Sequence, residues 1–231
     1  MHGLTDRKRW IFDNITKKGI LLDAGCMQGG GTFFYSKKAT KSFGIDAYSE
    51  FIKIAKKSYP KIEFKTEKIE KTSFTDNYFD VIILGDVLEH ISNENAALKE
   101  IKRIIKKDGE LIITVPKKGL FSFIDIDNLI LLAKKILRKT KNRPGYDDWH
   151  KHYSTKELKT ILGNHGFKIT KKYSNSLLLF PLASFVEYFS NLLFNKNNFF
   201  KKLALKMKDF DSKINYGFLA YNLFIKAKLE K

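Results

Sequence analysis

The first half of this chain alternates short apolar runs with amphipathic segments, and this alternation constrains the fold more than any other feature. Residues 79–84 and 110–115 are β-branched and apolar, as strands buried on both faces are. Residues 49–59 and 93–107 place apolar side chains on one helical face. Strands that alternate with helices of this length form a parallel sheet with right-handed crossovers. The sequence therefore predicts an α/β fold, with strands at residues 19–23, 42–46, 61–65, 79–84, 110–115, 166–169 and 218–229.

The second half has a less regular pattern. Residues 121–139 are amphipathic, residues 177–214 are apolar and basic, and both are expected to be helical. Residues 154–164 form a predicted helix that begins with a capping box, Ser154 and Glu157. We expect a single domain over residues 1–231, whose cofactor-binding half is residues 1–116. Helical insertions that cap the sheet and bind substrate are predicted at residues 117–150 and 171–215.

Composition narrows the class of protein. The chain is 43% apolar and 29% charged, which is typical of a globular protein and not of a disordered one. Cys26 is the only cysteine, so a disulfide framework is excluded and a reducing cytoplasm is the expected location. The polar, basic first ten residues predict no signal peptide, and the lack of 18 consecutive uncharged apolar residues predicts no membrane-spanning helix.

The net charge of +18 is concentrated in the second half of the chain. Residues 116–231 contain 23 Lys and Arg against 9 Asp and Glu, whereas residues 1–115 contain 20 against 16. Such a basic half attracts polyanions, including nucleic acid, anionic lipid headgroups and pyrophosphate-linked lipids. The abundance of Lys, Asn and Phe is also typical of AT-rich coding sequence, and this remains an alternative explanation of the total charge.

Two acidic strand ends and a glycine-rich bend predict a nucleotide-like ligand site. The first strand leads through L-L-D-A-G-C-M-Q-G-G-G, in which Asp23 precedes four glycines that allow the backbone to turn sharply beside a ligand. The second strand ends at Asp46, where a carboxylate accepts hydrogen bonds from both hydroxyls of a ribose. A structural alternative for Asp46 is a helix N-cap.

The fourth strand supplies the third segment, F-D-V-I-I-L-G-D-V-L-E-H-I at residues 79–91. Together the three segments resemble the class I S-adenosylmethionine-dependent methyltransferases, in the group with D-x-G-C-G-x-G and D-V-L-E-H motifs. The resemblance covers residues 20–167. It implies a Rossmann-like, doubly wound sheet of seven strands in the order 3-2-1-4-5-7-6, with strand 7 antiparallel. A nicotinamide-binding Rossmann domain is the competing interpretation, but it requires G-x-G-x-x-G and leaves the fourth-strand motif unexplained.

The resemblance implies S-adenosyl-L-methionine as cofactor and assigns its contacts residue by residue. Asp23 and the first turn would hold the methionine part, Asp46 the ribose hydroxyls and Ala47 the adenine, while Gly85 and Asp86 would lie beside the sulfonium. The family's acidic residue for the adenine amine is matched only loosely, by Glu67 or by Lys68 with Ile69. The full predicted cofactor set is Asp23, Gly25, Cys26, Met27, Gly29, Asp46, Ala47, Lys68, Ile69, Gly85 and Asp86.

Met27 departs from the family pattern, which has glycine at this position. With ordinary backbone angles, Met27 would leave the loop intact and turn its side chain away. If the position requires a positive φ, Met27 is strained and cofactor affinity should fall. Met27 also motivates a non-catalytic, methyltransferase-like scaffold as an alternative function, although Asp23, Asp46 and Asp86 are present.

Three histidines are candidate catalytic bases, because transfer to a hydroxyl requires removal of a proton. His90 follows the fourth strand, and a structural alternative is packing under the cofactor. His150 and His152 lie in D-D-W-H-K-H-Y-S, and in an extended segment they share one side. His150 is favoured, and surface positions for both are the alternative. A divalent metal is not expected, although Asp86, Glu89, His90 and His150 would form a carboxylate and imidazole ligand set.

The two predicted insertions are apolar with lysines at their edges, and this composition narrows the class of acceptor. Such helices suit a membrane interface, and packing on the sheet is the alternative. The segments P-K-K-G-L-F-S-F-I-D-I-D-N-L and H-K-H-Y-S are similar to methyltransferases associated with surface polysaccharide synthesis. We expect O-methylation of a sugar hydroxyl on a glycan or lipid-linked acceptor, by a cytoplasmic enzyme in peripheral contact with an anionic inner membrane. The alternative is an RNA 2′-O type methyltransferase, against which no separate RNA-binding module is visible.

Overall fold

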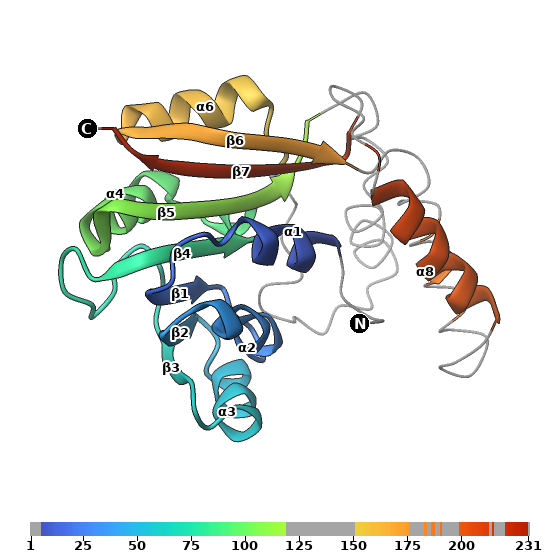
Figure 1. Ribbon diagram of the computed structural model, residues 1–231, viewed down its shortest axis with the longest axis horizontal. Coiled ribbons are helices and arrows are strands. Elements are labelled where there is room, and N and C mark those ends of the chain that lie inside the picture. Colours follow the sequence, from blue (N-terminus) through green and yellow to red (C-terminus); the bar gives the residue numbers. More distant parts are fainter. Residues whose placement is uncertain are drawn as a thin grey trace, which may run out of the picture. The chain divides into compact units, whose positions relative to one another are not determined.

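The protein is built on a seven-stranded sheet with strand order β3-β2-β1-β4-β5-β7-β6. β7 runs opposite to its neighbours β5 and β6, so the sheet is mixed (Figure 1). The computed structural model describes residues 6–118, 151–175, 199–212 and 220–230, together with residues 183, 186, 187, 190 and 214. The predicted Rossmann-like fold and strand order are confirmed.

The helices and strands follow the alternation of the sequence. The strands are β1 (Ile20–Ala24), β2 (Lys41–Asp46), β3 (Glu63–Thr66), β4 (Phe79–Gly85), β5 (Ile105–Pro116), β6 (Phe167–Asn175) and β7 (Asn222–Leu229). The described helices are α1 (Asp6–Asn14), α2 (Gly30–Tyr35), α3 (Ser49–Ser58), α4 (Glu94–Ile104), α6 (Thr155–Asn164) and α8 (Phe199–Ser212), with two short 3₁₀ helices, η1 (Ser36–Lys38) and η2 (Leu88–His90).

The register of the parallel strands brings their carboxyl ends to one edge of the sheet. β1 lies between β2 and β4, and Asp23 stands opposite Gly44 on one side and Ile83 on the other. β4 pairs with β5 so that Gly85 stands opposite Thr114. Because every one of these strands points the same way, the residues that follow them gather at the same edge.

The apolar core holds the N-terminal helix against the sheet. Ile11 and Ile15 are fully or almost fully buried with Leu21 of β1, Val81 of β4 and Ile112 of β5. Figure 1 shows α1 in front of β4, with α4 on the far side of β5. Burial of the apolar face of α1 supplies the driving force for a helix whose sequence is otherwise polar and basic.

Several boundaries differ from the sequence-based expectation. The strand predicted at residues 166–169 extends to Asn175, into the predicted helical insertion at residues 171–215, and the strand predicted at residues 218–229 begins at Asn222. The helix predicted at residues 93–107 ends at Ile104, and β5 begins at Ile105 because Phe79 pairs with Ile105 before the register shifts between Phe79 and Val81. The predicted helix end at residue 107 and the predicted strand start at residue 110 are therefore wrong. The helix predicted at residues 121–139 lies outside the described residues, and of residues 177–214 only α8 and five further residues lie within them.

The chain divides into two compact units. One consists of residues 1–115, 156–172 and 224–231, and the other of residues 116–155 and 173–223. The predicted insertions, residues 117–150 and 171–215, have boundaries near those of the second unit, and their role in binding substrate stays a prediction. Among the described helices, none combines the length and the apolar character that a bilayer crossing requires.

Candidate functional site

Asp46, at the end of β2, carries a carboxylate that is held in place from two sides. Its Oδ2 accepts a hydrogen bond from the Met27 backbone N–H at 2.9 Å, and its Oδ1 accepts one from Tyr48 at 3.0 Å. An ionised carboxylate has about four lone-pair sites, so two acceptor positions remain. The arrangement fits the two vicinal hydroxyls of a ribose, and Asp46 is not the N-cap of α3, since Tyr48 holds that position without a side-chain cap.

The glycine-rich turn after β1 passes through the left-handed region three times. The φ angles of Gly25, Met27 and Gly29 are 75°, 48° and 80°. The backbone N–H groups of Gly25 and Cys26 donate to the Ile45 carbonyl at 2.8 and 3.0 Å, which fastens the turn to β2. The position of Met27 therefore does require a positive φ, which costs a non-glycine residue about 1–2 kcal/mol. Its side chain is 39% exposed.

Cys26 lies in the same turn but directs its side chain inward. It is buried with Ile52 and Ala55 of α3 and Phe64 of β3. Burial raises the pKa of the Cys26 thiol, with the nearby carboxylates of Asp23 and Asp46 adding to the effect. The thiol is therefore neutral and packs as an apolar group, and only its backbone is available to a ligand.

Asp23 is a buried carboxylate at the end of β1. Burial raises its pKa to about 6, although the Thr32 hydroxyl donates a hydrogen bond to Oδ2 at 2.7 Å and Arg7 adds an opposing coulombic effect. A cation placed beside it would favour the ionised form. Asp23 is therefore suited to bind a positively charged group such as an ammonium.

Asp86 follows β4 with a φ of 56° and is connected to two residues that the sequence did not single out. The Thr114 hydroxyl, at the end of β5, donates to Asp86 Oδ1 at 2.6 Å, and the Asp86 backbone N–H donates to the Thr114 carbonyl at 3.0 Å. Arg7 of α1 forms an ion pair with Oδ2. Thr114 could have been found from the sequence, because it lies near the carboxyl end of the predicted strand next to β4. Nothing in the sequence pattern indicated Arg7.

The candidate adenine-contacting residues lie in the segment after β3. The Glu67 N–H donates to the Asp46 carbonyl at 3.1 Å, which places this segment next to the end of β2. The Glu67 carboxylate accepts hydrogen bonds from the Ser73 backbone N–H and hydroxyl at 3.0 and 2.6 Å. Lys68 and Ala47 are exposed, whereas Ile69 is 5% exposed. The Glu67 carboxylate is thus engaged within its own loop.

The candidate catalytic histidines fall in different parts of the molecule. His90 ends η2, half-buried, and its backbone N–H donates to the Val87 carbonyl at 3.0 Å. His152, in the second unit, is half-buried with its ring edge-on to that of Tyr221, at 6.1 Å between centroids. His150 lies outside the described residues.

The alternative metal ligand set is not assembled within the described part of the chain. No group of three or more His, Cys, Asp or Glu side chains is placed there to hold a metal ion. Glu89 is buried, and the Asp86 carboxylate contacts Thr114 and Arg7. The set of Asp86, Glu89, His90 and His150 includes one residue outside the described ranges.

The chain is similar to known methyltransferases in sequence. A family model described as a methyltransferase domain matches residues 22–113. An uncharacterised protein of Methanocaldococcus jannaschii is 33% identical over 170 residues, which span 74% of this chain and 63% of that relative. A ubiquinone biosynthesis O-methyltransferase of Pelagibacter ubique is 30% identical over 183 residues, covering 71% of this chain and 73% of that enzyme.

The fold is also that of solved methyltransferases. The structure of a geranyl diphosphate C-methyltransferase from Streptomyces coelicolor, in complex with Mg²⁺, geranyl diphosphate and S-adenosyl-L-homocysteine, aligns with a TM-score of 0.64. The alignment covers 97% of this chain and 77% of that one at 10% sequence identity, so it bears on the fold alone. The order of the strands and the sequence matches point to the same family, and the acidic edge of the sheet suits a nucleoside with a cationic side chain. The chain belongs to the class I S-adenosylmethionine-dependent methyltransferases.

Proposed function

We propose that this methyltransferase transfers a methyl group to a hydroxyl oxygen of a glycan or lipid-linked acceptor. The observation that carries the proposal is its relationship to an enzyme named an O-methyltransferase, which extends over 73% of that enzyme. We extend the proposal to a sugar hydroxyl on the sequence-based expectation that residues 116–129 and 150–154 resemble polysaccharide-associated methyltransferases. In this proposal the enzyme works at the cytoplasmic face of the membrane.

The edge of the sheet supplies the cofactor-binding groups. S-adenosylmethionine, when bound, provides an activated methyl group on a sulfonium. In the proposed site, the Asp46 carboxylate accepts hydrogen bonds from the ribose hydroxyls, and the Asp23 carboxylate faces the ammonium of the methionine part. Asp86, fixed by Thr114 and Arg7, lies beside the sulfonium. The methionine part of the cofactor lies along the backbone of the turn formed by Gly25, Cys26, Met27 and Gly29.

Proton removal is the remaining chemical requirement, because a neutral hydroxyl is a weak nucleophile for in-line displacement. His90, His150 and His152 are the proposed bases. Replacing the true base by alanine should lower kcat by about 10²–10⁴-fold and leave cofactor affinity nearly unchanged. A histidine whose replacement instead weakens cofactor binding acts by packing or positioning.

The test is a transfer assay with radiolabelled cofactor on separated lipid and aqueous fractions of a cell extract. Label in a lipid or glycan product that survives mild alkali excludes a carboxyl ester, and its recovery in an O-methylated sugar after hydrolysis supports an ether-forming O-methyl transfer. Release of the label by alkali indicates a carboxyl ester and contradicts the proposal. Asp46→Ala serves as the inactive control, and activity that persists with a chelator removes the alternative metal set.

The basic second half of the chain favours one other acceptor class, nucleic acid. Label recovered in an RNase-sensitive fraction would establish that function in place of the first. The same result predicts tight, strongly salt-dependent RNA binding, since each phosphate contact releases counterions.

A further inference from the structure

Helix α8 carries most of the large apolar side chains that the described residues expose. Nine large apolar residues are more than a third exposed, and six of them lie between residues 199 and 214. Their exposed fractions are 71% for Phe199, 60% for Phe210, 50% for Leu205, 47% for Phe200, 41% for Leu203 and 37% for Ile214. A concentration of this kind on one helix marks an interaction surface.

Three of these residues share one face of the helix. Phe199, Leu203 and Phe210 follow each other at intervals of four and seven residues, which is one stripe of an α-helix, whereas Leu205 lies on another side. All three are exposed, whereas Ala204 is buried. The helix therefore turns its apolar stripe toward solvent.

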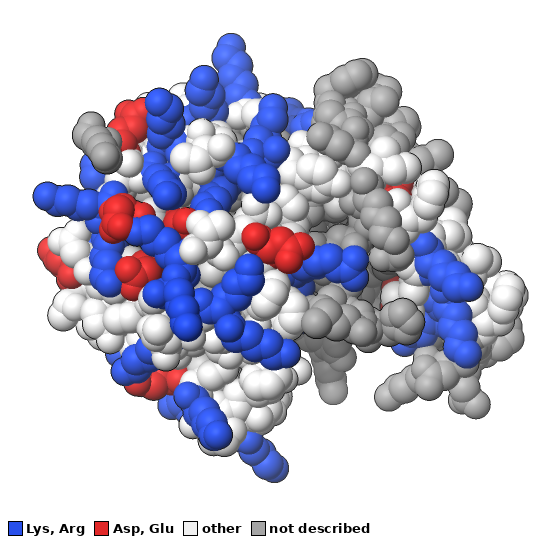
Figure 2. Space-filling view, in the orientation of Figure 1, with Lys and Arg blue, Asp and Glu red and all other residues white. Residues whose placement is uncertain are grey.

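The charge on α8 selects among partners. The helix has four lysines and two aspartates, and Lys202 and Lys206 are exposed beside the apolar stripe. Figure 2 shows basic side chains among uncharged ones over this helix. Lysine places its ammonium in the headgroup layer while its stem lies on apolar surface. Exposed leucine beside phenylalanine gains from contact with acyl chains, which binding to phosphate alone does not provide.

We propose that α8 docks on an anionic lipid bilayer, with Phe199, Leu203 and Phe210 at the boundary of the acyl chains and Lys202 and Lys206 among the headgroups. This is the geometry of an interfacial amphipathic helix, which lies in the plane of the membrane. The inference rests on the proposed function, which has the enzyme work at the membrane, and adds the surface that binds there. Its test is separate, because docking needs no acceptor and is measured without methyl transfer.

The experiment is flotation of the full chain with vesicles of phosphatidylcholine containing about one third phosphatidylglycerol, a fraction that gives a strongly anionic surface. Phe199→Ser with Phe210→Ser should lower the partition coefficient at least about tenfold, because two aromatic side chains no longer leave water. Lys202→Gln with Lys206→Gln should lower it about thirtyfold on anionic vesicles and leave binding to pure phosphatidylcholine unchanged.

Matched substitutions elsewhere serve as controls. Ile54 is 45% exposed on α3, and Lys168 and Lys172 are exposed on β6. Ile54→Ser, and Lys168→Gln with Lys172→Gln, should bind vesicles as the wild type does. Thermal unfolding should be the same for all these variants. The proposal is overturned if the wild type does not float, if the controls lose binding equally, or if the α8 variants instead abolish a dimer seen in sedimentation.

Discussion

Two buried carboxylates in the first unit, Glu110 and Asp23, have pKa values that are shifted in opposite directions. Glu110, on β5, is completely buried, yet its pKa is lowered, because bonds to Thr16 and Lys226 outweigh the effect of burial. Asp23 is also buried, but one hydroxyl bond and more distant cations do not outweigh burial, and its pKa is raised to about 6. The comparison indicates that the charge of Glu110 is compensated within the protein, whereas the charge of Asp23 is not compensated by the cations near it.

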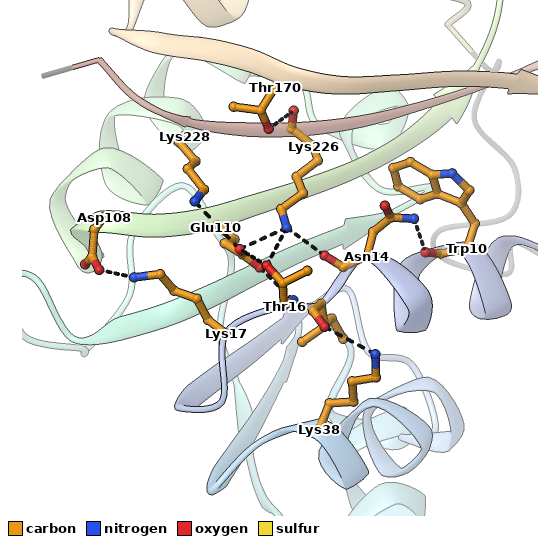
Figure 3. Close-up of polar contacts among 11 residues, drawn as sticks. Trp10, Asn14, Thr16, Lys17, Lys38, Asp108, Glu110, Thr170, Lys226 and Lys228 are labelled. Carbon is orange, nitrogen blue, oxygen red and sulfur yellow. Dashed lines mark hydrogen bonds and ion pairs between the residues drawn. The ribbon is translucent and has the colours of Figure 1, made fainter.

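The Glu110 cluster fastens the N-terminal segment to the sheet (Figure 3). Lys226 of β7 contacts Glu110 Oε1 at 2.9 Å and donates to the Asn14 carbonyl and the Thr16 hydroxyl, also at 2.9 Å each. The Thr16 backbone N–H donates to Glu110 Oε2 at 3.0 Å. Asn14 is the last residue of α1, and Thr16 lies two residues beyond it. Because α1 also brings Arg7 to Asp86, the Glu110 cluster supports the cofactor edge through the placement of α1.

The largest effect is expected at the cofactor edge. Asp46→Ala should weaken S-adenosylmethionine binding at least about a hundredfold, because two charge-assisted bonds to the ribose are lost, at about 1.5–3 kcal/mol each. The Met27 N–H also loses its acceptor. Isothermal titration measures the effect, and Asp76→Ala, which removes an exposed partner of Arg103, is the control. Normal binding by Asp46→Ala would refute the ribose assignment.

The next effect tests the Glu110 cluster. Lys226→Met should lower the free energy of unfolding by about 3–5 kcal/mol, because it leaves Glu110 charged and buried without its cation. The loss should shrink as the pH falls and should vanish below the lowered pKa of Glu110 in the folded wild type, because a protonated Glu110 needs no cation in either protein. Urea unfolding over a pH series measures both.

Lys228→Met provides the matched control. Lys228 lies 3.9 Å from Glu110 and is 40% exposed, so its loss should change the free energy of unfolding by less than about 1 kcal/mol. Equal losses for the two lysine variants would show that Glu110 is not held by Lys226 in particular. Cofactor affinity of folded Lys226→Met should stay near that of the wild type.

Asp23→Asn should act in the opposite direction to Lys226→Met. A folded-state pKa of about 6 against 3.8 in the unfolded chain means that ionised Asp23 destabilises the fold as the pH rises through this window. The amide should therefore raise the free energy of unfolding by up to about 3 kcal/mol at about pH 8, and by much less near pH 4.

The substitution that stabilises the fold should weaken cofactor binding. If Asp23 faces the methionine ammonium, wild-type affinity should decline as the pH falls below about 6, and Asp23→Asn should bind weakly throughout. Thermal unfolding measures the stability and titration calorimetry measures the cofactor affinity, both at matched pH values. A destabilised Asp23→Asn protein would contradict the contrast with Glu110.

The sequence predicted the order of the strands better than the side-chain contacts between segments far apart in the chain. Strand ends at Asp23 and Asp46 are local signals, since each follows an apolar run and precedes a bend or a helix. The ion pair of Arg7 with Asp86 joins residues 79 positions apart, and the Lys226 contact with Asn14 joins residues 212 apart. Such pairs depend on the packing of α1 and β7 on the sheet, and no local periodicity encodes them.

Met27 allows the smallest and most local test. Met27→Gly removes the strain of a left-handed backbone, about 1–2 kcal/mol, and adds about 0.5–1 kcal/mol of chain entropy to the unfolded state. The free energy of unfolding should rise by about 0.5–1 kcal/mol, with the N–H bond to Asp46 retained. Asn77→Gly, at a φ of 52°, should gain less, because asparagine tolerates this region. A Met27→Gly variant less stable than the wild type would show that the exposed thioether stabilises the turn more than its backbone strains it.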